Sequence, residues 1–184
     1  MSGEPEDLAP GGLAAGQFPG AAEELRRQEA FDVAWRFLGH RDRTEAEVRR
    51  NFTRKRVEPE LVEEVVSALL DGNYLDDATF AQRFAEDRRN LDGWGSERIE
   101  RRLAELGVAR EHIRAALAGG GGDEDGGGHD ELGAACELLA RRFPIPPDNP
   151  RDRDRALGFL VRKGYELELA HDALRRHAAA AVEN

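Results

Sequence analysis

Arginine is the residue type on which any chemistry of this chain depends. The chain has 27 Lys and Arg residues, and most of its arginines fall in three groups along the sequence. Several guanidinium groups on one helix face can bind phosphates or an acidic protein groove, whereas a single Arg beside Glu or Asp usually only solvates a helix. The candidate residues for binding a partner protein or DNA are Arg41, Arg43, Arg49, Arg50, Arg54, Lys55, Arg88, Arg89, Arg98, Arg101 and Arg102.

Other residues with chemical potential are few. Asp76 and Asp77 form a carboxylate pair, but Asp just before an apolar helical face typically caps the helix. Cys136 lies in an apolar helical stretch, where cysteine normally belongs to the core. His171 and His177 are six residues apart, not the four that place two metal ligands on one face. With no phosphate loop and no nucleophile elbow, the sequence predicts no enzyme, metal site, cofactor or small-molecule substrate.

The acidic charge of the chain is concentrated in two segments. The formal net charge is −10, yet residues 1–24 and residues 118–131 each hold five acidic residues and no Lys or Arg. Everything between and after them is therefore neutral overall and rich in arginine. The acidic total does not exclude an anionic partner, but it disfavours tight binding to free DNA.

Composition indicates a thin helical protein. Hydrophobic residues make up 40%, charged residues 35% and aromatic residues 7%. No stretch approaches the ~20 apolar residues of a membrane span. The N-terminus is acidic where a signal peptide would be basic, and a single cysteine excludes an internal disulfide. We therefore expect a cytoplasmic protein.

The elements that position the arginines are predicted to be helices. From Leu25 onward apolar residues recur at steps of three and four, as one buried helix face requires. Thr44 and Glu47 have capping-box spacing, Pro59 suits the first turn of a helix, and Asn73 tolerates the left-handed conformation that ends one. The same cycle then recurs twice.

Superposing the cycles gives an internal repeat, with an offset of 51 residues and then 57. The six extra residues fit a Pro-rich insertion at 144–150. We predict an all-α fold, an elongated array of three tandem three-helix repeats resembling helix-turn-helix units. The corresponding apolar positions are Val48, Ile99 and Ala156; Phe52, Leu103 and Leu160; Val57, Val108 and Tyr165; Val62, Ile113 and Ala170; and Val66, Leu117 and Leu174.

The predicted domain organisation follows from these repeats. Residues 1–24 are expected to be a disordered acidic tail and residues 119–129 a Gly-rich acidic linker. The three repeats occupy 25–73, 74–118 and 130–184. Because of the linker, we expect the third repeat to be held less tightly than the first two.

The run over residues 71–108 contains Tyr-Leu-Asp-Asp, then Phe-Ala and another Phe, and later a Gly before Arg-Ile. This run resembles the signature of the RecX family, and the resemblance extends well over 28–118 and more loosely over the third repeat. Asn73 and Arg56 stand where the family commonly has Gly, so the turn at Arg56 is expected to differ. We interpret most signature residues as structural, as core, caps or, for Tyr74, packing between repeats. They are Tyr74, Leu75, Asp76, Asp77, Phe80, Ala81, Phe84, Arg88, Gly95, Arg98, Ile99, Leu103 and Gly107.

The resemblance implies a function that spacing alone does not. RecX-like proteins lie in the groove of the RecA–single-stranded DNA filament and modulate, mostly inhibit, its recombinase, ATPase and co-protease activities. The resemblance therefore implies a regulator of homologous recombination, DNA repair and the SOS response. Such a protein is expected to act as a monomer and to bind single-stranded DNA weakly by itself.

Two other functions stay open at this stage. One is a helical-repeat adaptor that binds another protein. The other is a direct DNA-binding protein that uses its helix-turn-helix-like units, although no clear recognition helix is present and the net charge disfavours it.

Overall fold

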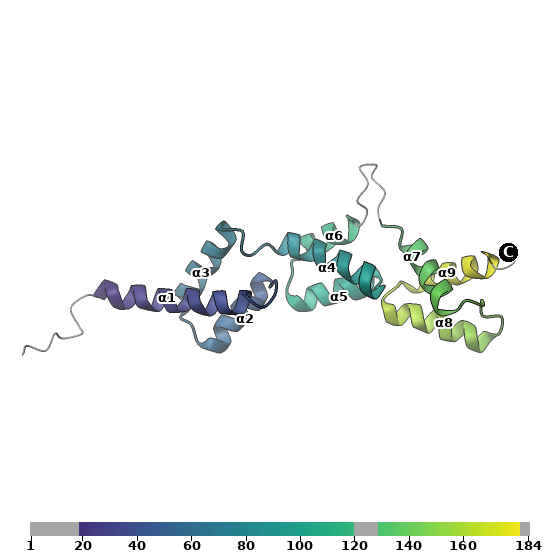
Figure 1. Cartoon of the computed structure of the whole chain (residues 1–184), viewed down its shortest axis with the longest axis horizontal. Helices are drawn as coiled ribbons and strands as arrows, with labels where there is room; N and C mark the ends of the chain where they lie inside the picture. Colours follow the sequence, from purple (N-terminus) through teal and green to yellow (C-terminus); the bar gives the residue numbers. More distant parts are fainter. Residues whose placement is uncertain (1–18, 120–128, 181–184) are drawn as a thin grey trace, which may run out of the picture.

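The computed structural model describes residues 19–119 and 129–180, and within these ranges it contains nine α-helices and no strand (Figure 1). The all-α prediction is confirmed. The helices are α1 (Pro19–Leu38), α2 (Glu45–Lys55), α3 (Pro59–Asp71), α4 (Asp77–Asp92), α5 (Ser96–Leu106), α6 (Arg110–Ala118), α7 (Glu131–Arg142), α8 (Pro150–Lys163) and α9 (Leu167–Ala180).

The helices form three units in a row, which makes the molecule elongated (Figure 1). Unit 1 comprises α1 to α3, unit 2 comprises α4 to α6, and unit 3 comprises α7 to α9. The strongest helix–helix packing lies within a unit, between its first and third helices in units 1 and 2 and between the third helix and both others in unit 3. Each unit has its own cluster of buried apolar side chains. The predicted array of three tandem three-helix repeats is confirmed.

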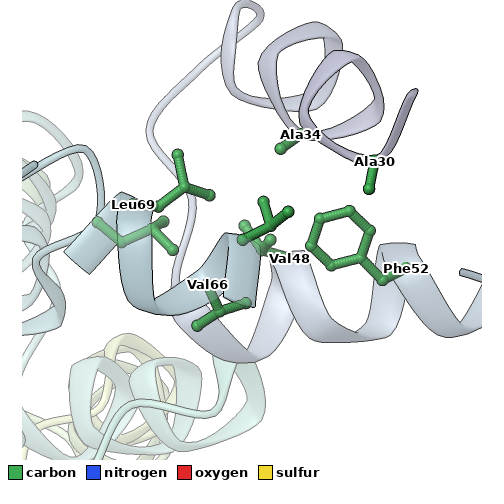
Figure 2. Packing of buried hydrophobic residues seen from close by; sticks show 8 residues of the cluster. Ala30, Ala34, Val48, Phe52, Val66 and Leu69 are labelled. Atoms are coloured by element: carbon green, nitrogen blue, oxygen red, sulfur yellow. The ribbon is translucent and has the colours of Figure 1, made fainter. Parts of the chain in front are cut away.

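The second helix of each unit supplies the centre of that unit's core. Val48 and Phe52 of α2 are 0% exposed, and Figure 2 shows them among side chains from α1 and α3. Burying one such side chain contributes about 1.5–3 kcal/mol. The corresponding residues of the other two units are equally buried: Ile99 and Leu103 of α5, and Ala156 and Leu160 of α8.

Most of the signature's apolar residues are core, as predicted. Ile99 and Leu103 are fully buried, and Phe80 and Phe84 are partly buried against the core of unit 2. Leu75 is 2% exposed but belongs to the core of unit 1, although its position places it in the second predicted repeat. The chain therefore leaves one core and enters the next within a few residues.

The helix ends follow the predicted caps. Thr44 and Glu47 form both bonds of a capping box at α2, and Asn73 has the left-handed conformation with φ 55°. Arg56 is also left-handed, with φ 58° and ψ 38°. Its turn has the same form as those at Gly107 and Gly164, so the expectation that this turn would differ was wrong.

The first helix begins earlier than predicted. It starts at Pro19, whereas we placed residues up to 24 in a disordered tail. Ion pairs to α3 hold its early part: Arg26 binds Glu58 at 3.3 Å and Arg27 binds Glu64 at 3.0 Å. The rest of the predicted tail, and the linker over 120–128, lie outside the described residues.

Candidate partner-binding surfaces

Units 1 and 2 meet where the N-terminus of α2 abuts the C-terminus of α5. The buried Thr44 hydroxyl donates a 2.8 Å hydrogen bond to the Leu106 carbonyl, and Arg50 donates to the same oxygen at 2.9 Å. The Asp77 carboxylate accepts from the Glu45 backbone N–H at 2.9 Å. Because the positive end of one helix dipole faces the negative end of the next, this head-to-tail joint is electrostatically favourable.

Units 2 and 3 repeat the same joint with different side chains. The Gly95 N–H donates to the Lys163 carbonyl at 2.9 Å, and the Lys163 ammonium donates to the Asp92 carbonyl at 2.7 Å. Glu131 accepts from both the backbone N–H and the hydroxyl of Ser96, at 2.7 and 2.8 Å. Unit 3 is thus bonded to unit 2 by both backbone and side-chain groups.

Both joints use one carboxylate in the same place. Asp77 is the first residue of α4 and Glu131 the first of α7, and each caps the first N–H of the previous unit's second helix, at Glu45 and Ser96 respectively. A carboxylate at a helix N-terminus binds an otherwise unpaired donor and is favoured by the dipole. Asp77 therefore links two units, a role that the sequence did not reveal.

The Asp76–Asp77 pair is structural, not an acid–base pair. Asp76 caps its own helix through the Thr79 N–H at 2.9 Å, and the bonds from Thr79 lower the pKa of Asp76. Burial raises the pKa of Asp77, an effect that its bond from the Glu45 N–H only partly offsets. The predicted capping role holds for Asp76.

Two signature glycines are required by the joints. A Cβ at Gly95 would lie 2.3 Å from the Gly164 carbonyl oxygen, and a Cβ at Gly107 would lie 2.4 Å from the Ala46 Cβ. Both distances are far shorter than real carbon contacts. These glycines permit neighbouring units to approach closely.

Several candidate cations of unit 1 already form ion pairs within the protein. Arg41 binds Glu47 at 2.5 Å. Arg43 binds the same carboxylate at 3.4 Å and stacks on Phe37, 4.1 Å from the ring centroid. Arg49 lies between Glu45 at 2.6 Å and Glu63 at 2.5 Å. These carboxylates neutralise the cations locally, which reduces their value for binding a partner.

Unit 2 uses its arginines in the same way. Arg88 and Arg98 lie over the Trp94 ring, 5.5 and 4.1 Å from its centroid, and Arg88 also pairs with Asp92. Arg89 donates to the carbonyl oxygens of Ala116 and Leu117 at the end of α6, and burial lowers its pKa. Arg102 pairs with Glu105 at 2.8 Å.

Among the candidate cations, those that remain exposed without an ion pair lie on α2 and α5. Lys55 and Arg101 are exposed and make no polar side-chain contact among the described residues. Arg54 is exposed and bonds only the Asn51 amide, at 2.7 Å. Arg56, which we treated only as a departure from the family pattern, is exposed beside them. The structure thus brings Arg54, Lys55 and Arg56 together at the C-terminus of α2.

An exposed aromatic pair lies beside the first joint, and sequence analysis missed it. Tyr74 is 61% exposed and Trp35 is 40% exposed, with ring centroids 4.7 Å apart in an edge-to-face arrangement. The pair lines a hollow of about 460 Å³ together with Arg41 and Arg83. The prediction that Tyr74 packs between repeats was wrong. Exposed Trp, Tyr and Arg side chains are typical of binding surfaces.

The signal for this pair was present in the sequence. Trp35 lies off the apolar stripe of α1, and Tyr74 follows the left-handed Asn73, outside any helix. The backbone turn also leaves room for the ring, because a Cβ at Gly72 would lie 2.7 Å from Tyr74. An aromatic residue outside the helical period was the feature to notice.

The other sequence-level candidates show no catalytic arrangement. Cys136 packs partly buried against the core of unit 3, and burial raises the pKa of its thiol. Across 19–119 and 129–180, no cluster of His, Cys, Asp and Glu could hold a metal ion. In the same ranges no helix is both long and apolar enough to cross a membrane.

Comparison with known proteins identifies these repeats. Family models match in chain order: RecX, first three-helix domain, over 30–69; the second over 76–117; and the third over 129–174. The regulatory protein RecX of Chromohalobacter salexigens is 32% identical over 82% of this chain and 95% of its own. That of Deinococcus radiodurans is 32% identical over 84% of this chain and 71% of its own.

A solved structure has the same fold. The crystal structure of RecX from Lactobacillus salivarius superposes with a TM-score of 0.69, at 17% identity, over 84% of this chain and 97% of that one. Fold and relatives together define a regulatory protein built of three tandem three-helix domains. The chain belongs to the RecX family.

Proposed function

We propose that this chain binds the RecA–single-stranded DNA filament in the cytoplasm, as a monomer, and inhibits its recombinase, ATPase and co-protease activities. The observation that carries the proposal is the head-to-tail row of three units, which makes one elongated molecule (Figure 1). Several weak contacts along one polymer add up to an affinity that no single subunit provides. The filament is therefore preferred over free RecA or free DNA.

The available cations supply contacts to phosphates or acidic protein surfaces. Lys55 on α2 and Arg101 on α5 are exposed on successive units and are not paired with a carboxylate among the described residues. An unpaired guanidinium or ammonium group loses no internal ion pair when it binds a partner. Lys55 and Arg101 are better choices for mutation than Arg49 and Arg50, because Arg49 pairs with Glu45 and Glu63 and Arg50 belongs to the first joint.

The test is the ATPase rate of RecA on single-stranded DNA, measured against increasing amounts of this protein. We expect inhibition by the wild type and at least tenfold weaker inhibition by Lys55→Glu combined with Arg101→Glu, since each lost hydrogen bond to a charged group costs roughly 1.5–3 kcal/mol and a tenfold change corresponds to about 1.4 kcal/mol. The matched control is Arg110→Glu with Arg114→Glu, which changes net charge equally but on α6. No inhibition by the wild type would refute the function, and equal loss in the control would refute the assigned surface.

A second candidate function is a helical-repeat adaptor for another protein. The exposed Trp35–Tyr74 pair favours it, because exposed aromatic rings beside arginines form protein-binding hot spots. Capture of the chain by RecA-coated single-stranded DNA, compared with capture by free RecA and bare DNA, separates the two. Retention on the coated DNA alone supports the filament-binding function.

A further inference from the structure

The second helices of units 2 and 3 end in a glycine that the preceding unit covers. Gly107 and Gly164 have φ of 91° and 93°. A Cβ at Gly107 would lie 2.4 Å from the Ala46 Cβ of unit 1, and a Cβ at Gly164 would lie 2.2 Å from the Arg98 Cβ of unit 2. Each joint therefore requires that this position carry no side chain.

Unit 1 has the same helix end with a side chain in that place. Arg56 corresponds to Gly107, has left-handed dihedral angles, and donates its N–H to the Phe52 and Thr53 carbonyls just as Gly107 donates to Leu103 and Ala104. The Arg56 side chain is exposed. The backbone at the end of α2 thus has the form that accepts a preceding unit, but its Cβ fills the space that such a unit needs.

At the opposite end of the array, the second helix of unit 3 also differs from its counterparts in units 1 and 2. Helices α2 and α5 each have 11 residues, whereas α8 has 14 and ends at the same point in its repeat. The three added residues begin the helix about 4.5 Å earlier. They occupy the place where Thr44 and Gly95 contact the next unit, and Asn149 caps this extra turn through the Asp152 N–H at 2.9 Å.

We propose that the two ends of this chain are the two halves of a fourth joint, each sterically closed, by Arg56 at one end and by the extra turn of α8 at the other. The partner that fits the opened ends is a second copy of this chain, docked head to tail through helix-end backbone bonds like the one from the Gly95 N–H to the Lys163 carbonyl. The closures keep the array at three units and the chain a monomer. This proposal is independent of what the array binds.

The experiment opens one end in each of two chains and mixes them. The acceptor chain carries Arg56→Gly, and the donor chain lacks residues 150–152, which makes Asn149 the cap of an 11-residue helix. Sedimentation equilibrium should give the mass of one chain for the wild type and for each variant alone. The mixture should form heterodimers below about 1 mM, the effective concentration that a short linker provides at the natural joints.

Matched variants test the steric reason. Arg56→Ala removes the charge but keeps a Cβ, so its mixture with the donor chain should stay monomeric. If the deletion fails to fold by circular dichroism, Pro150→Gly, Arg151→Gly and Asp152→Gly together unwind the extra turn without shortening the chain. Monomers throughout in the Arg56→Gly mixture, or equal association with Arg56→Ala, would overturn the proposal.

Discussion

The Asp77 side chain caps a helix of the preceding unit and in this way links two units. Its carboxylate lies at the start of α4 but binds the first N–H of α2, in the preceding unit. Burial raises its pKa, and the nearby Glu45 carboxylate raises it further. The charged form is therefore less favourable in the folded chain than in the unfolded chain.

The resulting pH dependence can be tested with Asp77→Asn, which keeps an oxygen acceptor but does not titrate. Because the folded pKa of Asp77 is raised above its unfolded value, proton uptake stabilises the fold as the pH falls from neutral toward the unfolded pKa. Free energies of unfolding from urea titrations at pH 7 and pH 4.5 should show wild type gaining relative to Asp77→Asn at the lower pH. A relative loss of wild-type stability at pH 4.5 would contradict this expectation.

Asp77→Ala should lose about 1 kcal/mol of unfolding free energy at pH 7.

The pKa of Glu47 is shifted down, whereas that of Asp77 is shifted up, so the two carboxylates have opposite effects on how stability changes with pH. Burial pushes the pKa of Glu47 up, but hydrogen bonds from Arg41 and the Thr44 N–H, with the charges of Arg41 and Arg43, outweigh it and leave the pKa lowered. Its contribution to stability is present above the unfolded pKa and is lost as the pH falls through the lower, folded value. Glu47 is present in both the wild type and Asp77→Asn, so its contribution cancels when the two are compared at the same pH.

The sequence shows where the arginines lie along the chain, but it does not show which groups they contact. Arg49 and Arg101 look alike in sequence, since each lies four residues after a Glu on a helix that carries an apolar stripe. In the structure Arg49 lies between two carboxylates, one of them Glu63 on α3, while Arg101 has no polar side-chain contact among the described residues. The long-range member of such a network depends on tertiary packing, which periodicity does not encode.

At the scale of elements, the second helix of each unit contributes both to the core of the unit and to the contacts between units. Its apolar face forms the centre of the core, its N-terminus in units 1 and 2 contacts the next unit, and its C-terminus in units 2 and 3 receives the previous one. Caps and periodicity predicted α2, α5 and α8 correctly because each signal is local. The start of α1 was missed because Gly, Pro and Ala near residue 19 resemble a tail, while the ion pairs from Arg26 and Arg27 to α3 are not local.

The helix-end glycine permits a direct test at this scale. Gly107→Ala places a Cβ 2.4 Å from Ala46 at a φ of 91°, so we expect a loss of at least 1–2 kcal/mol from the backbone alone and a further loss from the joint. Urea unfolding measures the stability, and small-angle X-ray scattering reports whether units 1 and 2 separate. Gly20→Ala on α1, where the added Cβ meets nothing within 4 Å, should instead stabilise the chain by about 0.5–1 kcal/mol. Wild-type stability and scattering in Gly107→Ala would refute the close-approach role.

At the scale of the whole molecule, three separate cores are connected by polar contacts at helix ends. Among the described residues, no helix of one unit packs broadly on a helix of another. The contacts across the joints there are hydrogen bonds, all but the one from the Ser96 hydroxyl to Glu131 involving a backbone group, together with an ion pair between Arg83 and Asp42 at 3.8 Å. The repeat period predicted the number of units and their order. It could not predict how they are joined, because the joint residues Asp77, Ser96 and Glu131 lie outside the apolar pattern.

The joints determine how far the contact residues of successive units lie apart, and this leads to a prediction for the proposed function. Asp77→Ala combined with Glu131→Ala removes one cap from each joint while leaving all three cores intact. If inhibition of RecA depends on units that act together, the concentration for half-inhibition should rise by about tenfold or more, because avidity is lost when the units are no longer held in register. Glu86→Ala, which changes an exposed acidic residue of α4 that makes none of the joint bonds, is the control and should inhibit like the wild type. Unchanged inhibition by the double variant, in a chain whose scattering shows loosened joints, would mean that a single unit suffices and that the elongated array is not the basis of regulation.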